Sequence, residues 1–518
     1  MSRAVTVVLL LVPAGVVTWA FRPGYMNADT ILQYNTTQGG RLDDWYAPVL
    51  QQLWDAGVAV GLGAPTDVLF AQTLALTLGM YLVLRAAASR VVAALVSVAL
   101  IFAPPVLAQV MLLGRDTWLA CLVTLQAGCS IRWARTPGWR GRAWLAASLA
   151  SGFLAVASRQ NAAPLVLVVL VATVHRWLAA RDGSSARWHG WRTRLLSLAG
   201  ATAAVVVMAA SIGVLVSRVF DAFDRQPEAV LFGYDLAGMS VHEDALLLGP
   251  EAFPAQDLDQ LRRLWNPQNV LSVLLPPEQG GLQATVGPVP ADELSRDWRR
   301  EVPAHLGSYL SVRWTVFTMM IGVSERPTVV VHPGVDGNGW GYEIENPGAN
   351  RWFRSYLRVL ATDDTLIYGS ELSRPIWYLA IAAGSAAFLL RRAQRRRAGG
   401  LEVGLLAVGA LVYEAAFFVA AVGENYRYSY PSITLGLLAG AFVVLTVVRD
   451  RRERPPSGSF ELGAADEPSG SDDATTSPDS SVPAGRDSTT DGSSPRSEAA
   501  TAATTMSVSK QTGTANEM

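Results

Sequence analysis

Long apolar runs recur along this chain, and they constrain its fold more than any other feature of the sequence. A helix that crosses a lipid bilayer needs about 20 mostly apolar residues. Charged residues make up only 16% of the chain, whereas a soluble globular protein carries about 25%. The sequence therefore predicts an all-α polytopic membrane protein with about ten transmembrane helices. The expected spans are approximately 5–20, 66–84, 91–108, 117–131, 143–157, 162–178, 195–216, 375–390, 401–422 and 431–448.

Basic residues are distributed unevenly between the loops that join these runs. They gather in every second loop, at 85–90, 132–142, 176–194, 391–397 and 449–454. The positive-inside rule assigns such loops to the cytoplasm. We therefore expect a multi-pass protein of the cell membrane with cytoplasmic N- and C-termini, whose remaining loops are extracytoplasmic. The net charge of −1 argues against nucleic acid or another polyanion as a partner. Lys510 is the only Lys, an arginine-rich, actinobacteria-like composition typical of GC-rich genomes.

The runs divide the chain into four parts. Residues 1–216 form an N-terminal membrane module, and its first outer loop spans 21–65. Residues 217–374 are mixed in composition and suit an extracytoplasmic loop domain. Residues 375–449 supply the C-terminal membrane helices, and 450–518, rich in Ser, Thr, Pro, Gly and Asp, is expected to be a disordered cytoplasmic tail. The segment 46–63 is expected to be an interfacial or re-entrant helix. The segment 302–323 is expected to be a helix at the membrane surface, because Arg313 would be costly inside lipid.

The first outer loop is unusually polar and aromatic between Arg22 and Trp54. Asp29 lies shortly after the first apolar run, and Gln33 is its i+4 neighbour if this part is helical. Loss of water at the membrane boundary would raise the pKa of the Asp29 carboxyl toward the range of a general base. A solvated loop aspartate is the alternative, and position alone does not separate the two. Asp43 and Asp44 lie further along the loop.

Two short turns on the same outer side carry arginines. Arg115 and Asp116 precede the fourth run, where Asp116 could cap the helix, contribute to a site, or do both. Arg159 and Asn161 lie between the fifth and sixth runs. An arginine beside amide side chains could hold a phosphate, and its alternative role is to extend from the membrane edge toward water.

A fourth polar turn precedes the last run, at residues 423–431. Tyr426, Tyr428 and Tyr430 alone would suit an aromatic belt at the membrane interface. The addition of Glu424 and Arg427 exceeds what a belt needs. An arginine beside tyrosines suits the phosphate group of a lipid carrier, with aromatic rings available to stack on a sugar.

These motifs resemble those of the GT-C superfamily of integral-membrane glycosyltransferases. The resemblance rests on D-W-x-x-P at 44–48, R-Y-x-Y-P at 427–431, the basic–acidic pair at 115–116, and the large outer loop before the C-terminal helices. Members of this superfamily include protein O-mannosyltransferases, aminoarabinose transferases, and actinobacterial arabinosyl- and mannosyltransferases. Two departures from its pattern are visible. Asp29 follows Ala28 rather than another acidic residue, and Tyr46 stands where many relatives have histidine.

The resemblance implies a GT-C-like fold and a hexosyl- or pentosyltransferase. Such an enzyme moves a sugar from a polyprenyl-phosphate donor to a hydroxyl of an extracytoplasmic glycan, lipid or protein. It implies Asp29 and Asp116 as catalytic residues. The donor phosphate is expected at Arg115, Arg159, Arg427 and Tyr428, and other substrate contacts at Gln33, Asp44, Trp45, Tyr46, Asn161 and Glu424.

No cofactor is predicted. The sequence contains no phosphate-binding P-loop and no glycine-rich nucleotide motif in a strand–helix setting. His332 and Asp336 could bind a divalent metal, but two residues are weak support, so we expect a solvated turn there and no metal site. Cys121 and Cys129 share one apolar run and are expected to be buried as small apolar residues rather than to form a disulfide.

Two other classes of function compete with the glycosyltransferase. A transporter or flippase of lipid-linked sugars usually has inverted repeats and polar groups near the middle of the membrane. Here the apolar runs are almost free of charge, with Glu414 as the main exception. A membrane scaffold whose loop domain binds a wall polymer would leave the four polar turns unexplained. The sequence therefore favours an enzyme that works at the outer membrane interface, in contact with membrane lipid.

Overall fold

The computed structural model describes residues 3–453 except 43, 182–190, 225, 251, 254–255, 269–290 and 394–399. Within this part of the chain the regular structure is helical, and the bridges between extended segments are isolated ones. The predicted all-α class is confirmed. Asp43 and the predicted tail beyond Glu453 lie outside the described residues.

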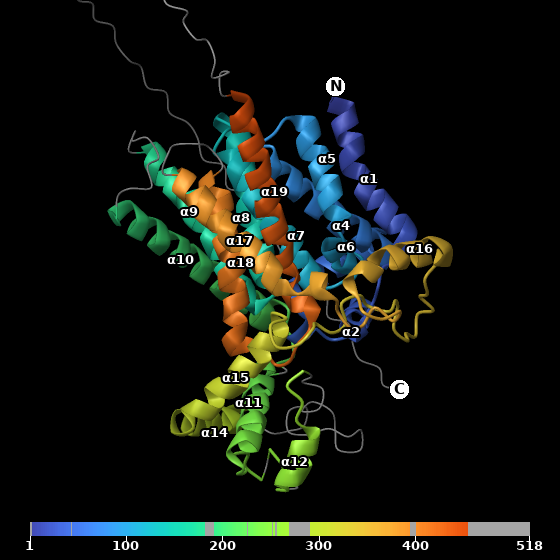
Figure 1. Ribbon diagram of the computed structural model, residues 1–518, viewed down its shortest axis with the longest axis vertical. Helices are drawn as coiled ribbons and strands as arrows, with labels where there is room; N and C mark the ends of the chain where they lie inside the picture. The colour runs from blue at the N-terminus through green and yellow to red at the C-terminus, as the bar shows by residue number, and fades with distance from the viewer. Residues whose placement is uncertain are drawn as a thin grey trace, which may run out of the picture. The chain divides into compact units, whose positions relative to one another are not determined.

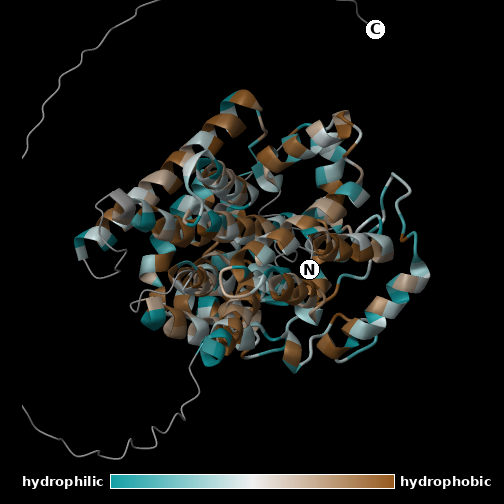
Figure 2. Ribbon diagram, turned by 90° about the horizontal axis from the view of Figure 1, so that it is seen from above, coloured by the Kyte–Doolittle hydropathy of each residue, from teal (hydrophilic) through white to brown (hydrophobic). Residues whose placement is uncertain are grey.

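Apolar helices occupy the positions of all the predicted spans and form one bundle (Figure 1). Several of them keep large apolar residues on their outer surfaces; on α10, Val206 is 60% and Val207 64% exposed. Figure 2 shows hydrophobic residues along the bundle helices. Such surfaces suit contact with lipid. The bundle helices are α1 (Arg3–Phe21), α4 (Pro65–Leu84), α5 (Arg90–Ile101), α6 (Pro104–Val110), α7 (Arg115–Trp133), α8 (Gly138–Ser158), α9 (Ala163–Arg181), α10 (Trp191–Val214), α17 (Pro375–Ala393), α18 (Gly400–Ala420) and α19 (Tyr430–Glu453).

Glycines allow the closest contacts within the bundle. A Cβ atom at Gly79 of α4 would lie 2.8 Å from the backbone nitrogen of Leu125, and one at Gly128 of α7 would lie 2.7 Å from Leu82 Cβ. Close approach through small residues is the common way for membrane helices to pack. Helix α7 therefore packs against α4, and it also packs against α8. Its two cysteines are buried and free, as the sequence predicted.

Within the described residues, six helices are long and apolar enough to cross a membrane, which makes the chain a multi-pass membrane protein. The third predicted span is wrong as a single helix, because α5 and α6 meet at an angle of 70°. Pro104 and Pro105 begin α6, and proline lacks the N–H and the space needed to continue a preceding helix. Counting this bent pair as one span gives seven, and α9 adds a shorter apolar segment, Ala163–Ala179. The total of about ten spans stays a prediction.

The first outer loop holds α2 (Ala28–Thr37), the 3₁₀ turn η1 (Asp44–Tyr46) and α3 (Pro48–Ala59). Helix α3 occupies the segment predicted as an interfacial helix, and it packs against α2 and α8. Short turns also join the bundle helices: η2 (Gln160–Ala162), the π-helical η3 (Leu215–Val219) and η8 (Tyr426–Ser429).

The segment between α10 and α17 supplies further helices. Helix α11 (Pro227–Glu243) packs against α12 (Leu258–Leu264), α14 (Ala291–Ala304) and α15 (Leu306–Met320), and α16 (Pro347–Leu357) packs against α1. The turns η6 (Arg358–Leu360) and η7 (Glu371–Ser373) lead to α17. In Figure 1, α11, α12, α14 and α15 lie beyond the end of the bundle opposite the N-terminus.

The placement of residues 302–323 as one helix at the membrane surface needs correction. The segment is divided between α14 and α15, which meet at His305. Arg313 is only 1% exposed; its guanidinium donates to the Asp235 carboxylate of α11 and, at 2.6 Å, to the Ala421 carbonyl. The cost of burying an arginine is thus offset by a protein carboxylate rather than by water at an interface.

Candidate active site

Helix α2 begins where it does because Asn27 caps it. The Asn27 side chain accepts hydrogen bonds from the Thr30 backbone N–H at 2.9 Å and from the Thr30 hydroxyl at 2.8 Å, as a helix N-cap does. This cap places Asp29 in the first turn of α2. The preceding Tyr25 donates its backbone N–H to Met111 and accepts from Leu113, at 2.8 and 2.9 Å. The start of α2 is thereby held against the connection that leads into α7.

Three separate turns bring arginines to this place. Arg115 begins α7, Arg159 follows the end of α8, and Arg427 lies in η8 just before α19. The Asn425 side chain caps η8 by accepting from the Arg427 backbone N–H at 3.2 Å. The four polar turns that the sequence singled out therefore meet in the folded chain.

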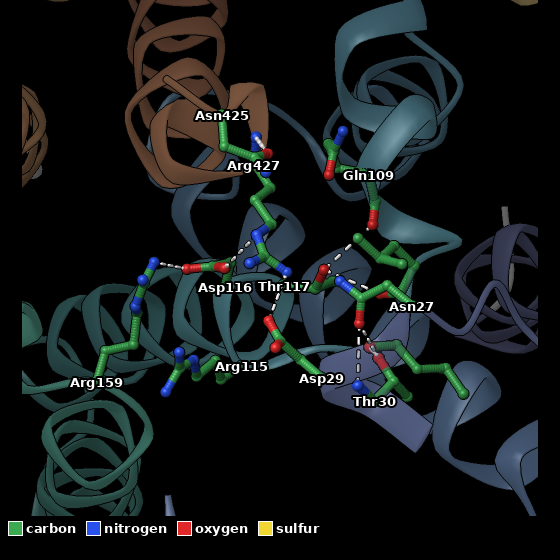
Figure 3. A network of polar contacts seen from close by, with 12 residues as sticks. Asn27, Asp29, Thr30, Gln109, Arg115, Asp116, Thr117, Arg159, Asn425 and Arg427 are labelled. Atoms are coloured by element: carbon green, nitrogen blue, oxygen red, sulfur yellow. Dashed lines mark hydrogen bonds and ion pairs between the residues drawn. The ribbon is translucent and has the colours of Figure 1, made fainter. Parts of the chain in front are cut away.

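The side chains form a connected network of charges (Figure 3). Arg427 Nη1 lies 2.8 Å from Asp29 Oδ2, and Arg427 Nε lies 3.9 Å from Asp116 Oδ2. Arg159 pairs with the other oxygen of Asp116. Arg115 donates to the Trp45 carbonyl oxygen, so it joins the start of α7 to the first outer loop.

The pKa of Asp29 is lowered, which contradicts the rise expected from the sequence. Burial by itself raises the pKa of this carboxyl, but the positive charges of Arg427 and Arg115, with a smaller contribution from Arg159, outweigh burial. Opposite charges nearby stabilise the ionised form. Asp29 is therefore a carboxylate at neutral pH, and its side chain is 29% exposed, so a small molecule in the site can reach it.

A cavity of about 950 Å³ opens beside this network. One part of its lining, the polar wall, carries most of the residues predicted from the sequence. Another part, the apolar wall, comes from the end of α10, from η3 and from the end of α18. The polar residues are Asp29, Asp44, Trp45, Arg115, Arg159, Asn161, Glu424, Arg427 and Tyr428; the apolar ones are Ala209, Ile212, Gly213, Val216, Phe417, Ala420, Ala421 and Val422.

Three of the predicted site residues do not line this cavity. Asp116 lies between Arg159 and Arg427, with its side chain 9% exposed (Figure 3). Tyr46 is in η1 next to lining residues. Gln33 faces a second, mainly apolar cavity of about 310 Å³, which also borders Arg115.

Tyr428 lies between two of the arginines. Its ring centroid is 4.9 Å from the guanidinium carbon of Arg159 and 5.4 Å from that of Arg427. The ring also stacks on Phe417, at 5.7 Å between centroids and 14° between planes. Such cation–π contacts favour a fixed orientation of both guanidinium groups.

Glu424 is held by the outer loop domain. Its carboxylate accepts from the Thr328 backbone N–H at 2.9 Å and from the Thr328 hydroxyl. Burial raises the pKa of Glu424 to about 7, although the hydrogen bonds from Thr328 act against this. The residue therefore connects the turn before α19 to the loop domain as well as lining the cavity.

His332 and Asp336, expected in a solvated turn, also line the cavity. The His332 side chain is 11% exposed, and its Nε2 lies 3.6 Å from Asp336 Oδ1. The i+4 spacing of a histidine and an aspartate was the available signal, but the sequence could not show that this loop folds over the site. Among the described residues no group of three or more His, Cys, Asp or Glu side chains could hold a metal ion.

Comparisons with known proteins complete the description of the site. No family model and no curated protein matches the chain. Among solved structures, the chain is similar to ArnT from Cupriavidus metallidurans bound to undecaprenyl phosphate, with 16% identity and a TM-score of 0.32 over 86% of this chain and 78% of that one. It is also similar to the apo state of ArnT, with 18% identity and a TM-score of 0.31 over 85% and 78%. Similarity at this TM-score carries no argument about activity, which has to come from the site itself.

Proposed function

We propose that this protein is a membrane glycosyltransferase of the GT-C type. It would move a sugar from a polyprenyl-phosphate donor to an acceptor hydroxyl outside the cytoplasm. The observation that carries the proposal is the cavity, whose lining combines three arginines and several carboxylates with an apolar part from α10, η3 and α18. A lipid-linked sugar phosphate has the same division between a charged head and an apolar chain.

The charges of the network favour a phosphate in the cavity. Three arginines (Arg115, Arg159 and Arg427) lie with two paired aspartates (Asp29 and Asp116), so the arginines of this network outnumber its carboxylates by one. Asp44, Asp336 and Glu424 also line the cavity. A buried charge without a partner is unfavourable. The single negative charge of a phosphodiester would balance it, and arginine is well suited to bind phosphate oxygens.

The apolar wall suits the isoprenoid chain of such a donor. It is built by helix ends of α10 and α18, and α10 keeps large apolar side chains on its outer surface. A chain that leaves the cavity along α10 would therefore pass from protein to lipid without crossing water. Burial of apolar chain atoms contributes about 0.8 kcal/mol per CH₂ group.

The proposed reaction is a displacement at the anomeric carbon of the sugar. The acceptor oxygen forms a bond to this carbon, the bond from the carbon to the phosphate oxygen breaks, and its electron pair stays on the phosphate. The arginines stabilise the charge that develops on the leaving phosphate. Asp29 would accept a hydrogen bond from a neighbouring donor group of the acceptor and so orient the attacking hydroxyl. Asp116, which lies between Arg159 and Arg427, would position both.

The remaining lining residues suit contacts with sugar hydroxyls. Asp44 and Asn161 offer hydrogen-bonding groups, and Trp45 offers an aromatic ring. The site lies near α2, toward the end of the bundle opposite the N-terminus (Figure 1). This arrangement supports an extracytoplasmic active site with cytoplasmic termini. It also makes the transporter less favoured, because the polar groups gather at one end of the bundle.

The proposal can be tested with the full chain in lipid nanodiscs. The probes are undecaprenyl-phosphate mannose, glucose and arabinose with labelled sugars, and the acceptors are octyl glycosides and a Ser/Thr peptide. We expect transfer from at least one donor, and a loss of about 10²-fold or more in Arg159→Gln, because one charge that stabilises the leaving phosphate is removed. Arg358→Gln, which alters an exposed arginine paired with Asp364, is the matched control.

Two results would overturn the proposal. One is the absence of both transfer and binding of undecaprenyl phosphate in the wild-type protein. The other is an equal loss of activity in Arg159→Gln and Arg358→Gln. The arginine in the cavity would then contribute no more to transfer than an exposed arginine elsewhere.

A further inference from the structure

The loop that carries His332 folds over the first outer loop. The backbone N–H of Met26 donates to the Gly334 carbonyl at 3.1 Å, and the N–H of Asp336 donates to the Met26 carbonyl at 2.8 Å. Met26 lies three residues before Asp29. These bonds place His332 and Asp336 on the cavity wall close to Asp29, although about 300 residues separate them in the chain.

The imidazole of His332 is fixed in one orientation. Its Nδ1 lies 2.8 Å from the Gly334 carbonyl oxygen and 3.3 Å from the Gly334 backbone nitrogen. The shorter contact is to a carbonyl oxygen, which can only accept, so we assign the hydrogen to Nδ1 and the free electron pair of the neutral ring to Nε2. Arg354 donates to the His332 carbonyl at 3.0 Å, and the Tyr25 ring lies 6.3 Å away between centroids. These contacts hold the loop that carries the ring.

Nε2 faces a carboxylate at the cavity. It lies 3.6 Å from Asp336 Oδ1, and Asp336 also lines the cavity. A lone pair and a carboxylate do not attract each other, but a protonated Nε2 would be stabilised by the negative charge. The arrangement therefore favours an imidazole that is neutral before the reaction and gains a proton during it.

We propose that His332 is the general base of the transfer and that Asp336 stabilises the imidazolium it becomes. This inference rests on the proposed glycosyl transfer and names the proton acceptor within it. The acceptor hydroxyl gives its proton to His332 Nε2 as its oxygen forms the bond to the anomeric carbon. The bond to the phosphate oxygen breaks, and its electron pair leaves with the phosphate. The imidazolium then returns the proton to the departing phosphate or to water.

The alternative base, Asp29, is less suitable in this structure. Arg427 holds its carboxylate at 2.8 Å, and a carboxylate whose pKa lies below the ordinary value is a weak proton acceptor. The charged groups around His332 are Asp336, Arg427 and Arg354. Burial lowers the pKa of His332, Asp336 acts in the opposite direction, and the two arginines lower it further. The ring is therefore neutral at neutral pH and free to accept a proton.

The experiment compares His332→Ala with the wild-type protein across pH, with undecaprenyl-phosphate sugars as donors and octyl glycosides as acceptors. The wild-type kcat should rise with pH through an acidic limb at or below the ordinary histidine value of about 6.5. In His332→Ala we expect kcat to fall by about 10²-fold or more and the limb to disappear. Added imidazole should restore part of kcat, because it can occupy the space of the ring. Asp336→Asn should move the limb to lower pH, since the stabilising carboxylate is lost.

His305→Gln is the matched control, because His305 pairs with Glu243 and Glu301 on the outer helices and does not line the cavity; its kcat and pH profile should equal the wild type. Binding of undecaprenyl phosphate, followed by thermal unfolding, should be unchanged in His332→Ala.

An active wild type with an unaltered kcat and limb in His332→Ala would overturn the role of His332 alone. If His332→Ala does not fold, Asp336→Asn provides the test. An acidic limb of the kcat profile at the same pH as in the wild type would then overturn the role of His332. A wild type that transfers no sugar would overturn the proposed function itself.

Discussion

Two Arg–Asp contacts in this molecule, one enclosed and one partly exposed, have opposite surroundings. In the outer helices Arg313 and Asp235 are 1% and 0% exposed, and Trp298 Nε1 donates to the same Asp235 oxygen at 2.8 Å. At the cavity Arg427 pairs with Asp29 while their side chains stay 20% and 29% exposed. The first contact sets one charge against one and is enclosed. The second belongs to a network with an excess positive charge beside an open cavity. A balanced pair supports the fold, whereas an unbalanced one is available to bind an anion.

The difference in surroundings also shifts the pKa values of Asp235 and Asp29 in opposite directions. Burial raises the pKa of both carboxyls. At Asp235 burial prevails over the attraction of Arg313, so the pKa is raised. At Asp29 the charges of Arg427 and Arg115 prevail, so the pKa is lowered. Asp29 has more than one arginine nearby and a more exposed side chain than Asp235, and both differences favour its ionised form.

The sharpest test of this comparison replaces the arginine of each contact. Arg427→Gln should lower transfer by about 10³-fold, because the charge that stabilises the leaving phosphate is lost, while the protein still folds. Arg313→Gln should lower the free energy of unfolding by about 3–5 kcal/mol, because it leaves Asp235 buried without its partner. Transfer rates per folded molecule and thermal unfolding in detergent measure the two effects. Equal destabilisation by both variants would remove the distinction between a functional and a structural contact.

A smaller effect is expected from Asp29→Asn. Transfer should fall by about 10²-fold, because the acceptor hydroxyl loses the group that orients it, and the variant should insert and purify normally. Because the pKa of Asp29 is lowered on folding, the stability of the folded protein depends on pH. The pairing of Asp29 stabilises the fold above the unfolded-state pKa of about 3.9, and this contribution is lost as pH falls through the folded-state value.

The same measurement separates the two aspartates. The difference in melting temperature between wild type and Asp29→Asn should shrink in acid. For Asp235, whose pKa is raised, the sign is reversed: its contribution is fully present below the unfolded-state pKa and is lost as pH rises through the folded-state value. A melting-temperature difference that behaves identically for Asp29→Asn and Asp235→Asn would contradict the opposite pKa shifts.

The smallest expected effect concerns Tyr428. Removing the ring in Tyr428→Ala should lower transfer by roughly 3- to 30-fold, since a cation–π contact contributes about 0.5–2 kcal/mol. Tyr428→Phe keeps the ring against Arg159 and Arg427 and should stay close to wild type. A larger loss in Tyr428→Phe than in Tyr428→Ala would assign the role to the hydroxyl group instead of to the ring.

The sequence by itself determined the helices and the residues of the polar turns. A long hydrophobic run is a local feature of the sequence, so it can be recognised without knowing the tertiary structure. The all-α class and the positions of the bundle helices could therefore be predicted. The arginines at 115, 159 and 427 and the aspartate at 29 were found because they lie in outer turns, where the positive-inside rule makes arginine unusual. The bend before Pro104 also had a local signal, in two adjacent prolines, but a continuous apolar run concealed it.

Only the tertiary structure decided how these residues act on one another. The pairing of Asp29 with Arg427, about 400 positions away in the chain, reversed the direction of its pKa shift. Packing placed Asp116 between two arginines and turned Gln33 toward a second cavity. His332 and Asp336 reached the site through backbone bonds to Met26. Electrostatic effects depend on distances in space, and hydropathy along the chain contains no information about contacts between distant turns.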